Sequence, residues 1–330
     1  MTAASRGIDV VTFGECMVLF RAESPGALAS ADRFTRSIAG AESNVAIGLA
    51  RLGLRVGWYS RVGDDLFGRQ ILGALEAEGI DCSGIAIDAE RPTGFQIKGR
   101  RDDGGDPEVA YFRAGSAASQ LSRADLSSEH LPRTRHLHVT GIPPALGAAA
   151  RDLCRHAMAV VREAGGTISF DPNLRPTLWS SRTDMIAQIN ALAAEADWFM
   201  PGLAEAETLT GLSEPEAIAD HYLRAGIREV AIKTGATGAY WATRSACGRA
   251  APIRLGRVVD TVGAGDGFAV GYLSARLEGL SVAAACARGN RLGARVCGHP
   301  GDFEGLPHRA TLLSEAGSTE TRVDTRSGTA

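Results

Sequence analysis

The chain has 330 residues, 45% of them hydrophobic, and a formal net charge of −3 at pH 7. This length is enough for one large core, and the small negative charge speaks against nucleic acid or a membrane surface as a partner. The six cysteines are scattered without a CxxC pair or zinc-ligand spacing, and no apolar run approaches the ~18 residues of a membrane span. We therefore expect reduced thiols, no disulfide framework, no zinc site and a cytoplasmic location.

Segments with the pattern of buried strands alternate along the chain with segments of helical periodicity. A β-rich segment is expected at 10–20, strands at 56–62, 136–140, 167–171, 197–200 and 229–234, and helices at 43–52, 66–78, 148–164, 184–196 and 215–225. Short buried strands separated by helices predict an α/β fold with a mostly parallel sheet covered on both faces. There is no internal repeat and no sign of a second domain.

Two segments interrupt this alternation, at about 21–38 and 93–113. Neither has a helical pattern, and 94–101 and 108–113 resemble alternating strands around a polar turn at 102–107. An extended insertion of this kind suits a lid over a binding site. Residues 314–330 are small and polar, which predicts a disordered tail after a single domain spanning 1–313.

Residues 258–268 carry the strongest functional signal. The apolar pair Val258-Val259, expected to be a strand, is followed by a Gly-Ala-Gly turn at 263–265, by Asp266 and then by a helical pattern. The first amides of a helix are unpaired and its dipole is positive there, so this turn is a candidate anion site. A carboxylate beside a bound phosphate suits a general base. The alternative is that Asp266 is an ordinary helix N-cap.

Residues 260–268 resemble the C-terminal signature of the PfkB/ribokinase family of carbohydrate kinases, and 39–46 with 61–68 resemble its Gly-rich N-terminal signature. The resemblance extends over about 10–307. It implies a ribokinase-like three-layer αβα core with a mostly parallel central sheet and a small β-sheet lid. Lids of this family often pair between subunits, so a homo-oligomer is expected.

The resemblance also implies site roles. Asp266 would be the catalytic base, and the amides of Gly263, Ala264 and Gly265 would form the anion hole for a phosphoryl group from ATP. Mg²⁺ is the implied metal, with a monovalent cation as an open addition. The position of Glu205, in Gly202-Leu203-Ala204-Glu205, matches an Asn-x-x-Glu motif whose Glu orients Mg²⁺ through water, with Gly202 replacing the Asn. Alternatively, Glu205 belongs to a solvated helix face.

No P-loop sequence occurs in the chain, so the nucleotide must be held by another device. A Gly-rich turn at 233–239 follows the strand at 230–232 and could equally be a tight hairpin turn. In the resembled family this turn lines the nucleotide phosphates and ribose, with Thr234, Gly235 and Gly238 as contacts, while Asn290 borders the adenine. The only two lysines, Lys98 and Lys233, are interpreted as compositional bias.

Arg113 and Arg175 follow the lid strand and a core strand and could converge on one anion. Guanidinium groups pair bidentately with carboxylates, which a neutral sugar would not require. The alternative is that both form structural ion pairs. The surrounding sequence resembles the 2-keto-3-deoxygluconate kinase branch of the family, which implies these contacts to the substrate: Tyr111, Arg113 and Arg175 at the carboxylate and keto end, Asp302 at the hydroxyl end, Gly40 and Asn44 at the floor, and Gln96 in place of a usual lid Tyr.

The expected reaction is the ATP-dependent phosphorylation of the terminal C6 hydroxyl of 2-keto-3-deoxy-D-gluconate, with this sugar acid and ATP as the small-molecule partners. Two alternatives stay open at this point. One is a neutral-sugar kinase of the same family, such as a fructokinase or ribokinase. The other is a non-catalytic, sugar-responsive regulatory protein built on the kinase scaffold, against which the intact Asp266 and Gly-Ala-Gly turn speak.

Overall fold

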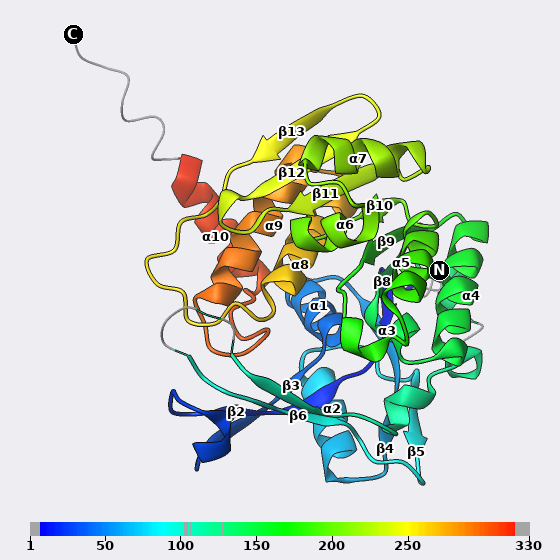
Figure 1. Cartoon of the computed structure of the whole chain (residues 1–330), viewed down its shortest axis with the longest axis vertical. Helices are drawn as coiled ribbons and strands as arrows, with labels where there is room; N and C mark the ends of the chain where they lie inside the picture. Colours follow the sequence, from blue (N-terminus) through cyan, green and yellow to red (C-terminus); the bar gives the residue numbers. More distant parts are fainter. Residues whose placement is uncertain (1–6, 102–104, 106, 127–128, 321–330) are drawn as a thin grey trace, which may run out of the picture.

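A nine-stranded sheet forms the centre of the molecule, and the structure, a computed structural model, describes residues 7–101, 105, 107–126 and 129–320. The strands are β1 (Val10–Phe13), β4 (Val56–Gly63), β5 (Ile85–Asp88), β8 (His136–Thr140), β9 (Thr167–Asp171), β10 (Trp198–Phe199), β11 (Glu229–Lys233), β12 (Ala239–Thr243) and β13 (Cys247–Ala250). They lie in the order β13-β12-β11-β10-β9-β8-β1-β4-β5 (Figure 1), antiparallel only at β11-β12-β13. The parallel pairs require crossover connections, which the intervening helices supply.

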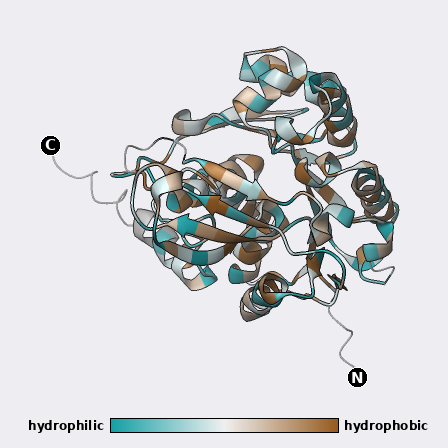
Figure 2. Ribbon diagram, turned by 60° about the horizontal axis from the view of Figure 1, so that its bottom comes forward, coloured by the Kyte–Doolittle hydropathy of each residue, from teal (hydrophilic) through white to brown (hydrophobic). Residues whose placement is uncertain are grey.

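Helices cover both faces of this sheet. One face carries α1 (Ala41–Arg51), α2 (Leu66–Ala77), α8 (Ala264–Leu277) and α9 (Val282–Cys297), and the other carries α4 (Ala148–Glu163), α5 (Arg182–Ala193), α6 (Leu203–Thr210) and α7 (Pro215–Arg224). Successive strand residues alternate between the two cores, so that Val10 packs with the first group of helices and Val11 with the second. Hydrophobic strand residues thus lie between two helical layers (Figure 2), which confirms the expected αβα core.

Helices α8 and α9 pack with their backbones in close approach. A β-carbon on Gly271 would lie 2.7 Å from the Cα of Gly289, and one on Gly267 would lie 3.1 Å from the Cα of Gly293. Larger residues at these positions would push the two helices apart. The position of α8 is therefore fixed by glycine contacts along its length.

A second sheet of four strands lies against one end of the core and forms the expected lid (Figure 1). Its strands, in spatial order, are β3 (Phe34–Ala39), β2 (Met17–Ala22), β6 (Phe95–Lys98) and β7 (Val109–Phe112). Strand β2 begins ahead of the expected lid segment at 21–38, and most of the polar turn at 102–107 lies outside the described residues. The ring of Phe67 on α2 lies 5.8 Å from the rings of both Phe20 and Phe95, which anchors the lid to the core.

Two segments differ from expectation. Helix α10 (Arg309–Glu320) runs into the tail that was expected to be disordered, because Leu312 is buried in the core and Glu315 pairs with Arg295; residues 321–330 lie outside the described part of the chain. The pair Val258-Val259 is not a strand. It lies in a loop whose Val259 amide donates a hydrogen bond to the carbonyl of Cys297, at 2.8 Å.

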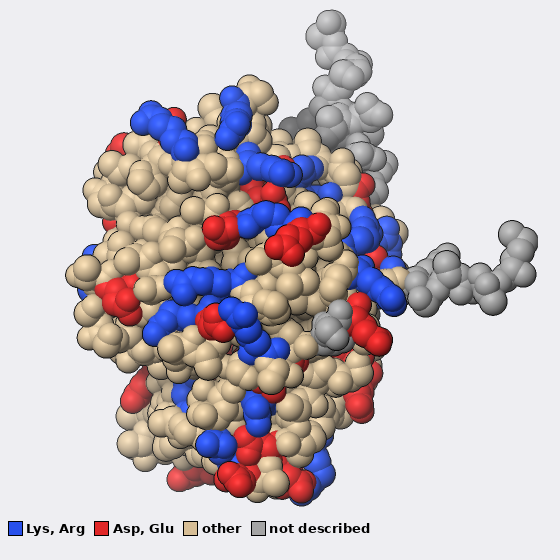
Figure 3. Space-filling model, turned by 90° about the vertical axis from the view of Figure 1, so that its right-hand side faces the viewer, with Lys and Arg blue, Asp and Glu red and all other residues tan. Residues whose placement is uncertain are grey.

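Basic and acidic side chains intermingle on the side of the molecule formed by α4 and α5 (Figure 3). The exposed pairs Arg123–Asp152 and Arg162–Glu195 involve α4, and such exposed pairs contribute little to stability. A short helix, α3 (Ile142–Ala145), leads into α4. None of the helices in the described residues is both long and apolar enough to span a membrane.

Candidate active site

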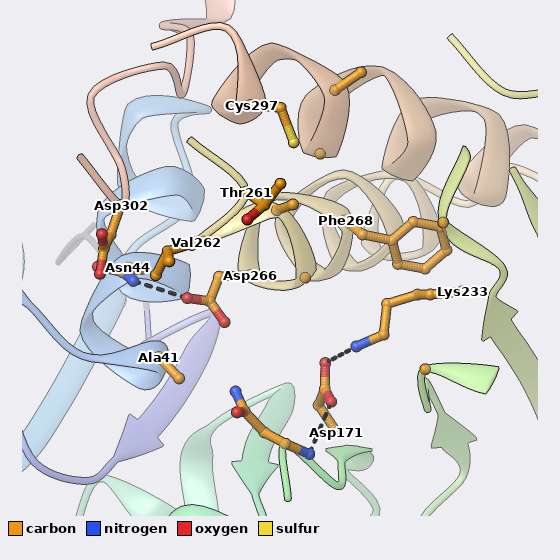
Figure 4. Close-up of a pocket in the computed structure, with 18 of the residues that line it drawn as sticks. Ala41, Asn44, Asp171, Lys233, Thr261, Val262, Asp266, Phe268, Cys297 and Asp302 are labelled. Atoms are coloured by element: carbon orange, nitrogen blue, oxygen red, sulfur yellow. Dashed lines mark hydrogen bonds and ion pairs between the residues drawn. The ribbon is translucent and has the colours of Figure 1, made fainter. Parts of the chain in front are cut away.

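A cavity of about 1210 Å³ opens between the core and the lid (Figure 4). Its floor contains the last residues of two parallel strands, Asp171 of β9 and Lys233 of β11, and its wall includes the start of α8. Ligands of open α/β sheets bind in this crevice outside the carboxyl ends of the strands. The volume exceeds the ~300–1,000 Å³ typical of a single-ligand pocket, so two substrates can be held side by side.

The first turn of α8 is built as an anion site. Gly263 is its N-cap with φ 84°, and a β-carbon there would lie 2.2 Å from the carbonyl oxygen of Asp302, so this position requires glycine. The preceding turn is fixed by the Val262 amide, which donates to Asp260 Oδ1 at 3.1 Å. No side chain of the described residues caps the helix, so its first amides and its dipole face the cavity. Asp266 is the third residue of α8 and not the N-cap, which removes the capping alternative.

The Asp266 carboxyl lies inside the cavity and accepts a hydrogen bond from Asn44 Nδ2 at 2.8 Å. Burial raises its pKa to about 7, against the effect of the Asn44 hydrogen bond, and the nearby carboxylates of Asp171, Asp302 and Glu42 raise it further. A carboxyl group with this pKa is poised to take a proton from a hydroxyl at neutral pH.

We expect kcat/KM for the acceptor to rise with pH through a midpoint near 7, since only ionised Asp266 can accept the proton. Glu42, whose pKa burial also raises to about 7, adds its negative charge to the causes that raise the pKa of Asp266. Glu42→Gln should move the midpoint to lower pH, and Asn44→Ala should move it to higher pH. If the midpoint arose from ionisation of the substrates, it would shift with neither substitution. A profile that is flat from about pH 5 to about pH 9 would exclude Asp266 as the base.

Lys233 was missed by the sequence interpretation. Its Nζ lies 2.5 Å from Asp171 Oδ2 and 3.5 Å from the place of a β-carbon on Gly265, so its charge stands beside the anion turn (Figure 4). Burial opposes this charge, but Asp171 and Glu205 outweigh the effect and raise the pKa of Lys233. A signal was available, because this chain uses arginine for all but two of its 35 basic residues and both lysines line the cavity. Compositional bias alone therefore does not account for where the two lysines lie.

The acceptor end of the cavity combines lid and core residues. Gln96 and Tyr111 come from β6 and β7, while Asn44 comes from α1. Arg113 lies at the end of the lid strand and forms a buried ion pair with Glu15, while its Nε has no hydrogen-bond partner among the described residues. The alternative of a structural ion pair therefore holds for Arg113.

Arg175 has a different environment. Its Nη1 donates to the carbonyl of Leu174 at 2.9 Å, and it has no ion pair within the described part of the chain. It projects from the loop after β9, which turns at Asn173 with φ 35°. The structural ion-pair alternative is thus not met for Arg175 among the described residues, and its guanidinium lines the cavity.

The turn after β11 lines the other end of the cavity. Gly235 and Gly238 face the cavity with φ of 60° and 98°, while Thr234 closes the turn through its amide, which donates to the Gly238 carbonyl at 2.9 Å. The hairpin interpretation is therefore correct as geometry, since β11 and β12 pair antiparallel across this turn. Asn290 also lines the cavity, with its Nδ2 donating to the carbonyls at 250 and 251. Sequence reasoning missed the apolar loop beside it, which contributes Ile253, Leu255 and Val258 to the lining.

Two predicted residues have structural tasks. Both Glu205 oxygens accept backbone hydrogen bonds, from Leu174 at 2.7 Å and Gly202 at 2.8 Å, which caps α6 and excludes the interpretation as a solvated helix face. Among the described residues no three acidic, His or Cys side chains form a metal cluster. Gly40 is the N-cap of α1 and packs against Glu15 behind the cavity wall.

A carboxyl base beside an anion-binding helix start, in a cavity large enough for two substrates and facing a lid, is the arrangement of an enzyme that transfers a phosphoryl group to a hydroxyl. Asp266, the 263–265 turn and Lys233 lie together in one cavity, in positions that suit these parts. The geometry thus places the protein in the class of small-molecule kinases.

Comparison with known proteins defines the family. Residues 8–309 match the model of the pfkB family of carbohydrate kinases, and the chain belongs to this family. The 2-dehydro-3-deoxygluconokinase of Bacillus subtilis (strain 168) is 52% identical over 93% of this chain and 95% of that protein. Fructokinase-1 of Oryza sativa subsp. japonica is 34% identical over 83% of this chain and 84% of that protein. A putative ribokinase II from E. coli, solved with ATP and Mg²⁺, has a TM-score of 0.86 at 26% identity, over 94% of this chain and 99% of that chain.

Proposed function

We propose that this carbohydrate kinase is a 2-dehydro-3-deoxygluconokinase, which transfers the γ-phosphoryl group of ATP to the C6 hydroxyl of 2-keto-3-deoxy-D-gluconate. The observation that carries this proposal is the guanidinium of Arg175, which lines the cavity and forms no ion pair with a carboxylate of the described residues. A sugar acid supplies the missing carboxylate, whereas a neutral sugar would leave the charge uncompensated. The higher identity to a 2-dehydro-3-deoxygluconokinase than to a fructokinase supports the same choice.

In this proposal the sugar acid lies between lid and core. Arg175 and Tyr111 hold its carboxylate and keto end, with the Nε of Arg113 as a further donor, and Asp302 approaches the hydroxyl end. The C6 hydroxyl then points at Asp266, which takes its proton as the oxygen attacks phosphorus in line. The proton stays on the Asp266 carboxyl, whose pKa of about 7 suits both states.

The nucleotide occupies the other end of the cavity. The turn at Gly235 and Gly238 faces its phosphates, and the apolar side chains of Ile253 and Leu255 provide a surface for its base. The amides at 263–265 hold the transferring group, and the ammonium of Lys233 lies beside them. This fixed positive field is what stabilises charge developing on the phosphoryl oxygens.

Glu205 suits magnesium held through water. Glu205, the residue proposed to orient it, has both oxygens engaged by backbone amides, and Mg²⁺ keeps several waters when phosphates supply its other ligands. When bound, the ion neutralises charge on the phosphates of ATP. The capping bonds of Glu205 do not involve the side chain at position 202, so Gly202 is compatible with this task.

An ADP-release assay with ATP and Mg²⁺ tests the acceptor, using 2-keto-3-deoxygluconate, its galactonate epimer, gluconate, fructose and ribose. Turnover confined to the keto-deoxy acids is the expected result. Preference for fructose or ribose would overturn the sugar-acid proposal while leaving the phosphoryl-transfer chemistry in place. Turnover of gluconate without the keto-deoxy acids would overturn the proposed acceptor, while equal turnover of gluconate and the keto-deoxy acids would show that the carboxylate is recognised without the keto group.

A further inference from the structure

Lys98 is a buried cation at the boundary between lid and core. It belongs to lid strand β6 and its side chain is 1% exposed. Its Nζ lies 2.5 Å from Asp260 Oδ2 and 2.7 Å from Asp302 Oδ1, and both carboxylates belong to the core. Burial opposes the charge, but Asp302 and Asp260 outweigh it and raise the pKa of Lys98, so the group is an ammonium at neutral pH.

The two carboxylates belong to the segments that shape the anion turn. Asp260 holds the turn from one side by accepting the hydrogen bond of the Val262 amide. The backbone of Asp302 lies against Gly263 from the other side, where a β-carbon would be 2.2 Å from its carbonyl oxygen. Asp260 and Asp302 both lie within 2.7 Å of the same Nζ atom, and two buried carboxylates so close together repel each other unless a cation lies between them. The geometry of the turn therefore depends on the charge that compensates this pair.

We propose that the Lys98 ammonium is the resident cation of this site, which positions the anion turn and makes turnover independent of a free monovalent cation. A potassium ion bound by Asp260 and Asp302 would require the volume that Nζ occupies. The monovalent cation that the sequence left open thus does not fit this carboxylate pair. The inference rests on the proposed role of the 263–265 turn in holding phosphate, and it assigns Lys98 as a positioning residue.

The first test uses the unmodified protein and needs no variant. ADP release, with ATP, Mg²⁺ and whichever acceptor is turned over, is measured in potassium chloride and in tetramethylammonium chloride at equal ionic strength. Tetramethylammonium is too large to enter a small carboxylate site, so this salt supplies no cation that could bind there. Because Lys98 already fills the site, potassium should add nothing, and the two rates should agree within about twofold. Activation by potassium of about tenfold or more would overturn the inference without touching the assignment of the acceptor or of Asp266.

The second test removes the ammonium. In tetramethylammonium chloride, Lys98→Met should lower kcat by about 10²–10³-fold, as expected for loss of a preorganised charge, with a smaller effect on acceptor KM. Ammonium, methylammonium or potassium should raise the kcat of the variant at least about tenfold above its value in tetramethylammonium chloride. Each should also raise the melting temperature of the variant, because each can fill the vacated position. Arg36→Met, on the exposed part of lid strand β3, is the matched control that loses a lid charge without either effect. A Lys98→Met enzyme that no cation restores, in rate or in melting temperature, would show that Lys98 serves only to pack the lid.

Discussion

Asp266→Asn should lower kcat by about 10²–10⁴-fold, the usual loss for removal of a general base. The amide has the shape of the carboxyl and still lies at the start of α8, but it cannot take a proton from the acceptor. Burial raises the pKa of Asp266 to about 7 in the folded protein, above its value in the unfolded chain. At a pH above the unfolded pKa, ionised Asp266 therefore destabilises the folded state. The melting temperature at pH 8 should therefore be equal to or above that of the parent enzyme, measured by calorimetry beside single-turnover ADP release.

The matched control for this substitution is Asp184→Asn. Asp184 is also the third residue of its helix, α5, but its carboxylate lies outside the cavity and accepts from Gln188. Asp184 shares the helix-dipole environment of Asp266 but has no access to substrate. The kcat of Asp184→Asn should therefore stay within about twofold of the parent value. Near-normal turnover by Asp266→Asn would remove the mechanism, whatever the acceptor.

We expect Arg175→Ala to raise KM for the sugar acid about tenfold to a hundredfold, which corresponds to the loss of a charge-assisted hydrogen bond. The KM for ATP and the melting temperature should change little, because Arg175 makes no ion pair within the described residues. Steady-state kinetics with 2-keto-3-deoxygluconate and with fructose separates charge recognition from shape. An equal loss for both acceptors would contradict recognition of the carboxylate.

Arg113→Ala provides the contrast. It removes the partner of Glu15, a carboxyl whose pKa burial already raises against the effect of Arg113, so the variant loses stability as well as acceptor affinity. Combining it with Glu15→Gln should recover the melting temperature and leave the KM defect. Recovery of both would assign Arg113 a purely structural role.

The sequence was sufficient for local features and insufficient for pairings across the chain. Alternating buried strands and helices predicted the αβα core, and the 258–268 segment predicted the helix start with Asp266 inside it, although its apolar pair proved to be a loop. The pairing of Arg113 with Glu15, and of Lys98 with two core carboxylates, joins lid residues to distant segments that no local pattern connects. The helical part of the tail has the same origin, since Leu312 and Glu315 obtain their partners from the folded core.

The glycine contact between α8 and α9 divides the molecule into a part that tolerates variation and a part that does not. Any side chain added at Gly271 would displace the helix that carries Asp266, so the machinery of phosphoryl transfer is closed to gradual change. Gln96 and Tyr111 belong to a lid that contacts α2 through the rings of Phe20 and Phe95. Lid positions other than Lys98 can therefore change and alter the fit of the acceptor while the core is inherited unchanged, which is a route by which one ancestral scaffold could diversify into kinases for many sugars.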